Sequence, residues 1–186
     1  LTALPSGVVI ALLRLFGANF FVIYKFGQIP IVLVYSLCCY FAMKRLHSGK
    51  MILAVVVMFP TSLFIASNYS YDTWVIGFVM IGMAYFVGNC QEEGVVSTKD
   101  TVIMVIAFAI AIIPKQIYLA FLIIPFLMKR NKIENKKKYY SICSMAFVIM
   151  LFDLLLKTIF ETSKGGDVRG GAGVNPTEQI LYIIHN

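Results

Sequence analysis

Lys115 is the residue of this chain that is best placed to bind an anion. It follows Pro114 between two apolar runs, residues 101–113 and 116–128, each of which is short for a full membrane crossing. Helices this short would meet below the membrane surface, where a cation needs an anion or a water-filled cavity. A lipid phosphate would meet that need, and Tyr118, one helical turn further on, could hydrogen-bond the same ligand. The alternative is a lysine that reaches the surface from an ordinary outer loop.

Asp72 is a second candidate for ligand binding. It lies beside Tyr71 and Trp74, and a carboxylate flanked by aromatic side chains is suited to sugar recognition. The alternative is that Asp72 caps the N-terminus of the helix predicted for residues 73–87. We expect Asp72 and Lys115 on the same side of the membrane.

Two further charged groups lie towards the end of the chain. Arg169 stands among glycines just before a predicted helix start at Asn175, where backbone N–H groups could help to hold an anion. The alternative for this segment is a flexible connection. Asp153 and Lys157 are four residues apart in an apolar run, and we expect them to neutralise each other. The alternative is that Asp153 is functional, as intramembrane carboxylates often are.

The composition places these residues in a membrane protein. The chain is 60% hydrophobic and 13% charged, with a mean hydropathy of +0.84, whereas soluble domains are about 25% charged. The net charge of +7 could suggest nucleic-acid binding. However, the basic residues flank apolar runs instead of lining a solvated face. We therefore predict an all-α, polytopic transmembrane bundle with lipid as its surroundings and no nucleic-acid partner.

The apolar runs predict one transmembrane domain with six crossings. An interfacial helix is expected at residues 5–16, because this run is too short to cross the hydrocarbon core. The pair of short helices should meet at Pro114-Lys115, because the residue before a proline disfavours continued helix. The predicted crossings are residues 25–44, 51–68, 73–87, 101–113, 116–128 and 139–160, followed by a glycine-rich loop at 161–175 and the start of a further helix at 176–186.

The basic loop Lys129–Lys138 orients these crossings. It holds six of the sixteen Lys and Arg residues, and short basic loops between apolar spans stay in the cytoplasm. With six crossings, this orientation places Asp72, Lys115 and residues 161–175 on the extracytoplasmic side of the membrane. If residues 101–128 formed one long helix, residues 161–175 would be cytoplasmic instead.

No cofactor is indicated by these residues. The four cysteines and two histidines show no metal-ligand spacing, and a divalent metal is left open. The chain begins with Leu1 and stops within a helical run, so we expect it to be an internal fragment of a longer membrane protein. The sequence gives no indication of oligomeric state.

Three segments carry a family resemblance. Residues 58–72, residues 114–119 and residues 175–179 resemble the bacterial membrane family called domain of unknown function 2142. That resemblance implies that Asp72 and Lys115 match family positions. The family is similar in layout to GT-C type glycosyltransferases that use polyprenyl-phosphate sugars. This likeness implies an acidic catalytic residue in a first extracytoplasmic loop, upstream of Leu1.

The expected function is therefore a GT-C-like glycosyltransferase that uses a lipid-linked sugar to modify a cell-envelope polysaccharide. Lys115 would hold the carrier phosphate, Arg169 would assist, and Asp72 and Tyr118 would shape the site. The alternative is a non-catalytic role, either as a flippase-like transporter of envelope lipids or as an assembly component. It would use the same phosphate site without chemistry.

Overall fold

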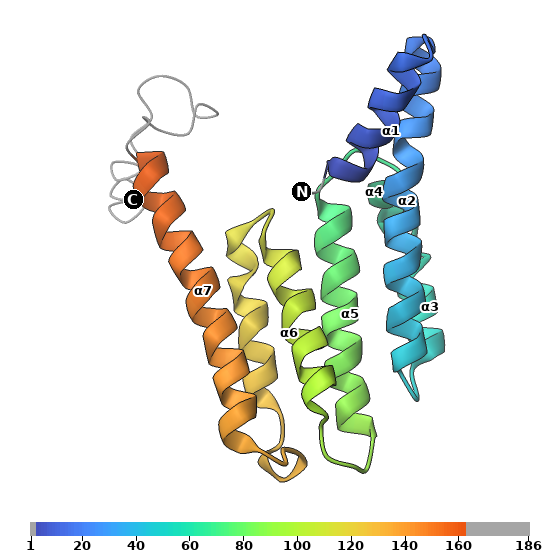
Figure 1. Cartoon of the computed structure of the whole chain (residues 1–186). Helices are drawn as coiled ribbons and strands as arrows, with labels where there is room; N and C mark the ends of the chain where they lie inside the picture. Colours follow the sequence, from blue (N-terminus) through green and yellow to red (C-terminus); the bar gives the residue numbers. More distant parts are fainter. Residues whose placement is uncertain (1–2, 163–186) are drawn as a thin grey trace, which may run out of the picture. The chain divides into compact units, whose positions relative to one another are not determined.

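The protein folds into helices joined by short connections (Figure 1). A computed structural model describes residues 3–162, and within that range there is no β-strand. The predicted all-α class is confirmed. The chain divides into two compact units, residues 1–151 and residues 152–186. All features below lie in the first unit unless the second is named. Arg169, the glycine-rich loop and the predicted final helix lie outside the described residues.

The helices follow one another with few intervening residues. Their bounds are α1 Leu4–Leu15, α2 Phe20–Arg45, α3 Lys50–Val57, α4 Pro60–Ala66, α5 Asp72–Gln91, α6 Thr98–Ile112, the 3-10 helices η1 Gln116–Leu127 and η2 Arg130–Lys132, and α7 Lys136–Thr162. The pair of short helices predicted to meet at Pro114-Lys115 is therefore present as α6 and η1.

Three of these helices are long and apolar enough to cross a membrane. They are Phe20–Arg45, Asp72–Gln91 and the Lys136–Lys157 part of α7. The helices α1 and η1 are apolar but shorter. The remaining crossings, including that predicted for residues 101–113, stay predictions. In η1, twelve residues in 3-10 geometry extend roughly 24 Å at about 2.0 Å per residue. An α-helix with the same number of residues would be shorter.

The run predicted as one crossing at residues 51–68 is divided into α3 and α4. Phe59 precedes Pro60 and takes an extended conformation, with φ −59° and ψ 136°, because proline excludes α-helical geometry from the residue before it. The break leaves carbonyl groups of α3 without helical partners. The Tyr35 hydroxyl of α2 donates to the carbonyl oxygen of Val57 at 2.8 Å. The broken helix is therefore tied to α2 at the break.

Glycines on α5 allow its neighbours α2 and α6 to approach closely. A Cβ added at Gly77 would lie 3.0 Å from the Cys38 sulfur of α2, and one at Gly88 would lie 3.1 Å from the Arg45 carbonyl oxygen of α2. One at Gly82 would lie 2.7 Å from the Phe108 ring of α6. Small residues serve this purpose in membrane helices, where close backbone packing provides much of the association energy. Helix α5 therefore packs against α2 and α6 on two different faces.

The main core lies among α6, η1 and the first part of α7. Its buried members include Met104, Phe108, Leu122 and Cys143. The Phe108 and Phe121 rings are stacked with centroids 6.1 Å apart. The Tyr139 hydroxyl of α7 donates to the carbonyl oxygen of Pro125 at 2.7 Å. The ring contact holds η1 against α6, and the hydrogen bond holds it against α7.

Candidate functional site

Asp72 begins α5 but does not cap it. Tyr71 occupies the N-cap position, and no side chain makes a capping hydrogen bond there. The N-cap alternative for Asp72 is therefore wrong, because α5 begins one residue earlier than the predicted run 73–87. Instead, the Ser70 hydroxyl donates to the Asp72 carboxylate at 3.0 Å and accepts from the Asp72 backbone N–H at 3.1 Å. This arrangement fixes the carboxylate at the start of the helix.

Lys115 lies at the α6–η1 junction, where the sequence places it. Its backbone is extended, with φ −143° and ψ 114°. Its N–H bonds the Ile112 carbonyl oxygen at 3.0 Å. The side chain leaves α6 and reaches the beginning of α5. There its ammonium Nζ lies 3.6 Å from Asp72 Oδ1 and 4.9 Å from the centre of the Tyr71 ring. We call Ser70, Tyr71, Asp72 and Lys115 the Asp72 cluster.

The Asp72 cluster is accessible. The side chains of Lys115 and Asp72 are 42% and 35% exposed, so a ligand could reach both. The Tyr71 side chain and then the Asp72 carboxylate raise the pKa of Lys115 above its ordinary value. The lysine is therefore a stable cation, and its partner in this structure is a carboxylate of the protein.

Of the other predicted site residues, Tyr118 is connected to this cluster through its backbone, and Arg169 is not described. The Tyr118 backbone N–H bonds the Lys115 carbonyl oxygen at 3.2 Å. The Tyr118 ring stacks on Phe121, with centroids 6.0 Å apart. Trp74 stacks on Phe78, and its buried indole N–H has no acceptor among the described residues. Arg169 lies outside the described residues, so its predicted role is untested.

The sequence did not predict a pocket that lies at the same end of the unit as the Asp72 cluster. It has a volume of about 280 Å³ and is lined by Lys25, Gln28, Ile29, Val32, Leu33 and Ser67. The Tyr69 hydroxyl donates to the Tyr24 carbonyl oxygen at 2.7 Å, which joins the beginning of α2 to the turn before Asp72. The only sequence signal for this pocket was a lysine close to the beginning of an apolar run.

A second charged cluster lies at the opposite end of α5. The Arg45 guanidinium, at the end of α2, binds the Glu92 carboxylate. Arg45 Nη2 also bonds Asn89 Oδ1 at 2.5 Å and Asp100 Oδ2 at 3.1 Å. Asn89 is only 1% exposed, and charged hydrogen bonds of this kind are strong in such surroundings. Arg45 therefore joins α2, the end of α5 and the beginning of α6.

Lys132 completes what we call the Arg45 cluster, which consists of Arg45, Asn89, Glu92, Asp100 and Lys132. Its ammonium donates to the backbone oxygens of Cys90 at 2.7 Å, Glu92 at 2.5 Å and Asn89 at 3.3 Å. A cation at the end of a helix satisfies free carbonyls and complements the helix dipole. The basic loop therefore also has a structural role. The Arg45 side chain lowers the pKa of Glu92 through its hydrogen bond, which keeps this carboxylate ionised.

The two clusters differ in what they can do. The Arg45 cluster connects three helices, and its arginine side chain is only 15% exposed, so it is suited to holding the fold. The Asp72 cluster is more open and offers a cation, a carboxylate and aromatic rings. No group of three or more His, Cys, Asp or Glu that could hold a metal occurs in the part of the chain that the structure describes.

The family comparison agrees with the membrane character of these helices. The family model described as "Predicted membrane protein (DUF2142)" matches residues 2–186. The chain belongs to this family. Its Asp72 and Lys115 lie within the matched region. No curated protein and no solved structure matches the chain. The likeness to GT-C enzymes therefore stays a prediction for this member of domain of unknown function 2142.

Proposed function

We propose that this membrane protein binds a lipid-linked sugar at the Asp72 cluster and acts as a GT-C-like glycosyltransferase on a cell-envelope polysaccharide. The observation that carries the proposal is the contact between Lys115, at the α6–η1 junction, and Asp72, in the first turn of α5, whose charged atoms lie 3.6 Å apart. A lipid-linked sugar has a phosphate and hydroxyl groups side by side, and a cation beside a carboxylate offers a partner to each of them.

Each residue has a separate role in this proposal. Lys115 binds the carrier phosphate, because its ammonium has three donors and Asp72 approaches only one side of it. Asp72 accepts hydrogen bonds from sugar hydroxyls, and Tyr118 borders the site. Arg169 would supply a second cation. The predicted catalytic base is upstream of Leu1, so the proposal assigns no catalytic residue within this chain.

A second candidate function is the transfer of envelope lipids without chemistry. It is favoured by the pockets near the two ends of α2, since one includes Lys25 and the other includes Leu46. A transporter needs to hold lipid in both leaflets, whereas a transferase needs its carrier on only one face. The two candidates share the Lys115 site and differ in whether a sugar is transferred.

The proposal is tested by native mass spectrometry of the purified full-length protein with polyprenyl phosphate in mild detergent. Lys115→Ala should weaken carrier binding by roughly tenfold or more, because a hydrogen bond to a charged group is lost. Arg14→Ala is the matched control, since it removes an exposed cation in the last turn of α1. Carrier binding that is absent, or equal in Lys115→Ala and wild type, would reject the phosphate site.

Asp72→Asn separates the two parts of the site. This variant removes the carboxylate that faces Lys115 and keeps the size of the side chain. The affinity for polyprenyl phosphate should be equal to that of the wild type or higher. The affinity for the sugar-bearing carrier should increase by less than this, or decrease, because the sugar hydroxyls lose the carboxylate. Transfer of labelled sugar to envelope polysaccharide would favour the enzyme. Movement of carrier between leaflets without sugar transfer would favour the transporter.

A further inference from the structure

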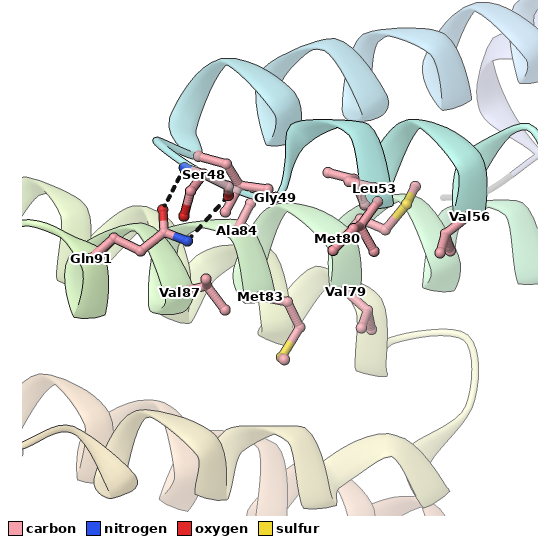
Figure 2. A pocket seen from close by; sticks show the side chains of 12 residues that line it. Ser48, Gly49, Leu53, Val56, Val79, Met80, Met83, Ala84, Val87 and Gln91 are labelled. Carbon is pink, nitrogen blue, oxygen red and sulfur yellow. Dashed lines mark hydrogen bonds between the residues drawn. The ribbon is translucent and has the colours of Figure 1, made fainter.

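An apolar groove runs between α3 and α5, at the end of the unit that holds the Arg45 cluster (Figure 2). It has a volume of about 320 Å³, which is within the range of small-molecule sites. Its walls are side chains of α3, including Leu53 and Val56, and of α5, including Val79, Met83 and Val87. Among the described residues, it is a surface that the proposed transferase function does not use.

The groove exists because α3 is short and its outward face is not covered. Val57 is buried at 6% exposure, with Leu53 packed against the same cluster. By contrast, Ile52 and Val56 are 73% and 53% exposed. These apolar side chains line the groove while remaining open to the surroundings. In a membrane protein those surroundings are acyl chains, which fit an open apolar groove.

One end of the groove is polar and held in place by hydrogen bonds. Gln91 Nε2 donates to the Ser48 carbonyl oxygen at 3.1 Å, and Gln91 Oε1 accepts from the N–H groups of Ser48 and His47 at 3.1 and 3.0 Å. Figure 2 shows the Gln91 side chain bonded to Ser48, beside Gly49 and Ala84. The α2–α3 connection is therefore a fixed rim around the mouth of the groove.

Two lysines lie close to this rim along the chain, within two residues of Leu46 and Gly49, which line the groove. Lys44, near the end of α2, and Lys50, the first residue of α3 directly after Gly49, are both exposed. Neither makes an ion pair within residues 3–157, whereas Arg45 is bound to Glu92 and Asp100. An apolar groove with exposed lysines close to one end in the chain complements an acyl chain attached to an anionic headgroup. Basic pockets between helices on the cytoplasmic side bind such lipids.

We propose that this groove binds an anionic phospholipid of the cytoplasmic leaflet. One acyl chain lies between α3 and α5, and the phosphate lies at the rim with Lys44 and Lys50. The site is separate from Lys115 and holds a structural or regulatory lipid. It does not depend on the Asp72 cluster, so Lys115→Ala should leave it unchanged.

The test is a titration of the purified full-length protein with phosphatidylglycerol or phosphatidylcholine carrying identical acyl chains, followed by native mass spectrometry. Phosphatidylglycerol should bind at least about tenfold more tightly, because each lysine near the headgroup contributes to anionic lipid binding. The double variant Lys44→Gln/Lys50→Gln should remove this preference. Its matched control is Lys136→Gln/Lys137→Gln, which removes two exposed charges at the start of α7.

The groove itself is tested by a pair of neighbouring substitutions on α3. Val56→Trp fills the groove, whereas Val55→Trp adds the same ring at an exposed residue that does not line it. Val56→Trp should weaken phosphatidylglycerol binding about tenfold or more, and Val55→Trp should leave it within about twofold. Both variants should unfold near the wild-type temperature.

Three results would overturn the proposal. The two lipids could bind equally, which would remove the role of the lysines. Val55→Trp and Val56→Trp could have the same effect, which would remove the role of the groove. A dimer lost only in Val56→Trp, with lipid binding unchanged, would assign the groove to a second copy of the chain.

Discussion

The guanidinium of Arg45, the last residue of α2, lies 3.1 Å from the carboxylate of Asp100 in the first turn of α6. The same arginine binds Glu92 and Asn89 at the end of α5. Three helices thus meet at one side chain at the predicted cytoplasmic end. This contact leads to the first prediction.

Arg45→Ala should lower the free energy of unfolding by about 2–4 kcal/mol, because it leaves buried and half-buried acceptors without a partner. Arg45→Lys should recover only part of this loss, since an ammonium cannot reproduce the forked contacts of a guanidinium. Thermal unfolding in detergent measures the effect, with Arg14→Ala as the exposed control. Equal unfolding temperatures for Arg45→Ala and Arg14→Ala would show that the cluster does not hold the helices together.

Stability should fall in acid through Glu92. Its pKa is lowered in the folded protein by the Arg45 hydrogen bond, from an ordinary value of 4.5. A lowered folded-state pKa stabilises the protein above the unfolded pKa, and this stabilisation is lost as the pH falls through the folded value. The unfolding temperature should therefore decrease below about pH 4.5.

The pH effect has a matched control. Glu92→Gln should reduce the acid-induced decrease in unfolding temperature, because the variant has no carboxylate to protonate at this position. Glu93→Gln should not reduce it, since Glu93 is exposed. Identical pH profiles for the two variants would contradict the role of Glu92.

Gly82→Ala should destabilise the packing of α5 on α6. The added Cβ would lie 2.7–2.8 Å from three atoms of the Phe108 ring, which is fully buried and cannot easily move. Such overpacking costs about 1–3 kcal/mol. Gly7→Ala is the control, because nothing lies within 4 Å of its added Cβ, and it should be neutral or slightly stabilising. Phe108→Leu should partly rescue Gly82→Ala, and an absence of coupling would argue against this contact.

The predicted orientation can be measured by cysteine labelling of intact cells. Cys90 is exposed, whereas Cys38, Cys39 and Cys143 are buried. With the predicted orientation, Cys90 should react with a membrane-impermeant maleimide only after the cells are permeabilised. Ser67→Cys in a Cys90→Ser background should react in intact cells. The opposite pattern would place Lys115 in the cytoplasm and remove the basis for an extracytoplasmic sugar site.

The sequence by itself determined the helical class, the membrane surroundings and the place where α6 ends. Long apolar runs can satisfy their backbone groups in lipid only as helices, and Pro114 disfavours helix at the preceding residue. Pro60 likewise explains the break between α3 and α4. These features are local, because they depend on residue type and on neighbours a few positions away.

Only the tertiary structure decided which charges meet. Arg45 and Glu92 are 47 residues apart, and nothing local to either one indicates the other. The same holds for Lys115 and Asp72, and for the two walls of the α3–α5 groove. Such contacts depend on the direction, spacing and register with which helices pack. These are set by the whole interface, including the close approach of Phe108 to Gly82. A local pattern identifies a helix and its charged ends, but the partner of each charge is decided by this packing.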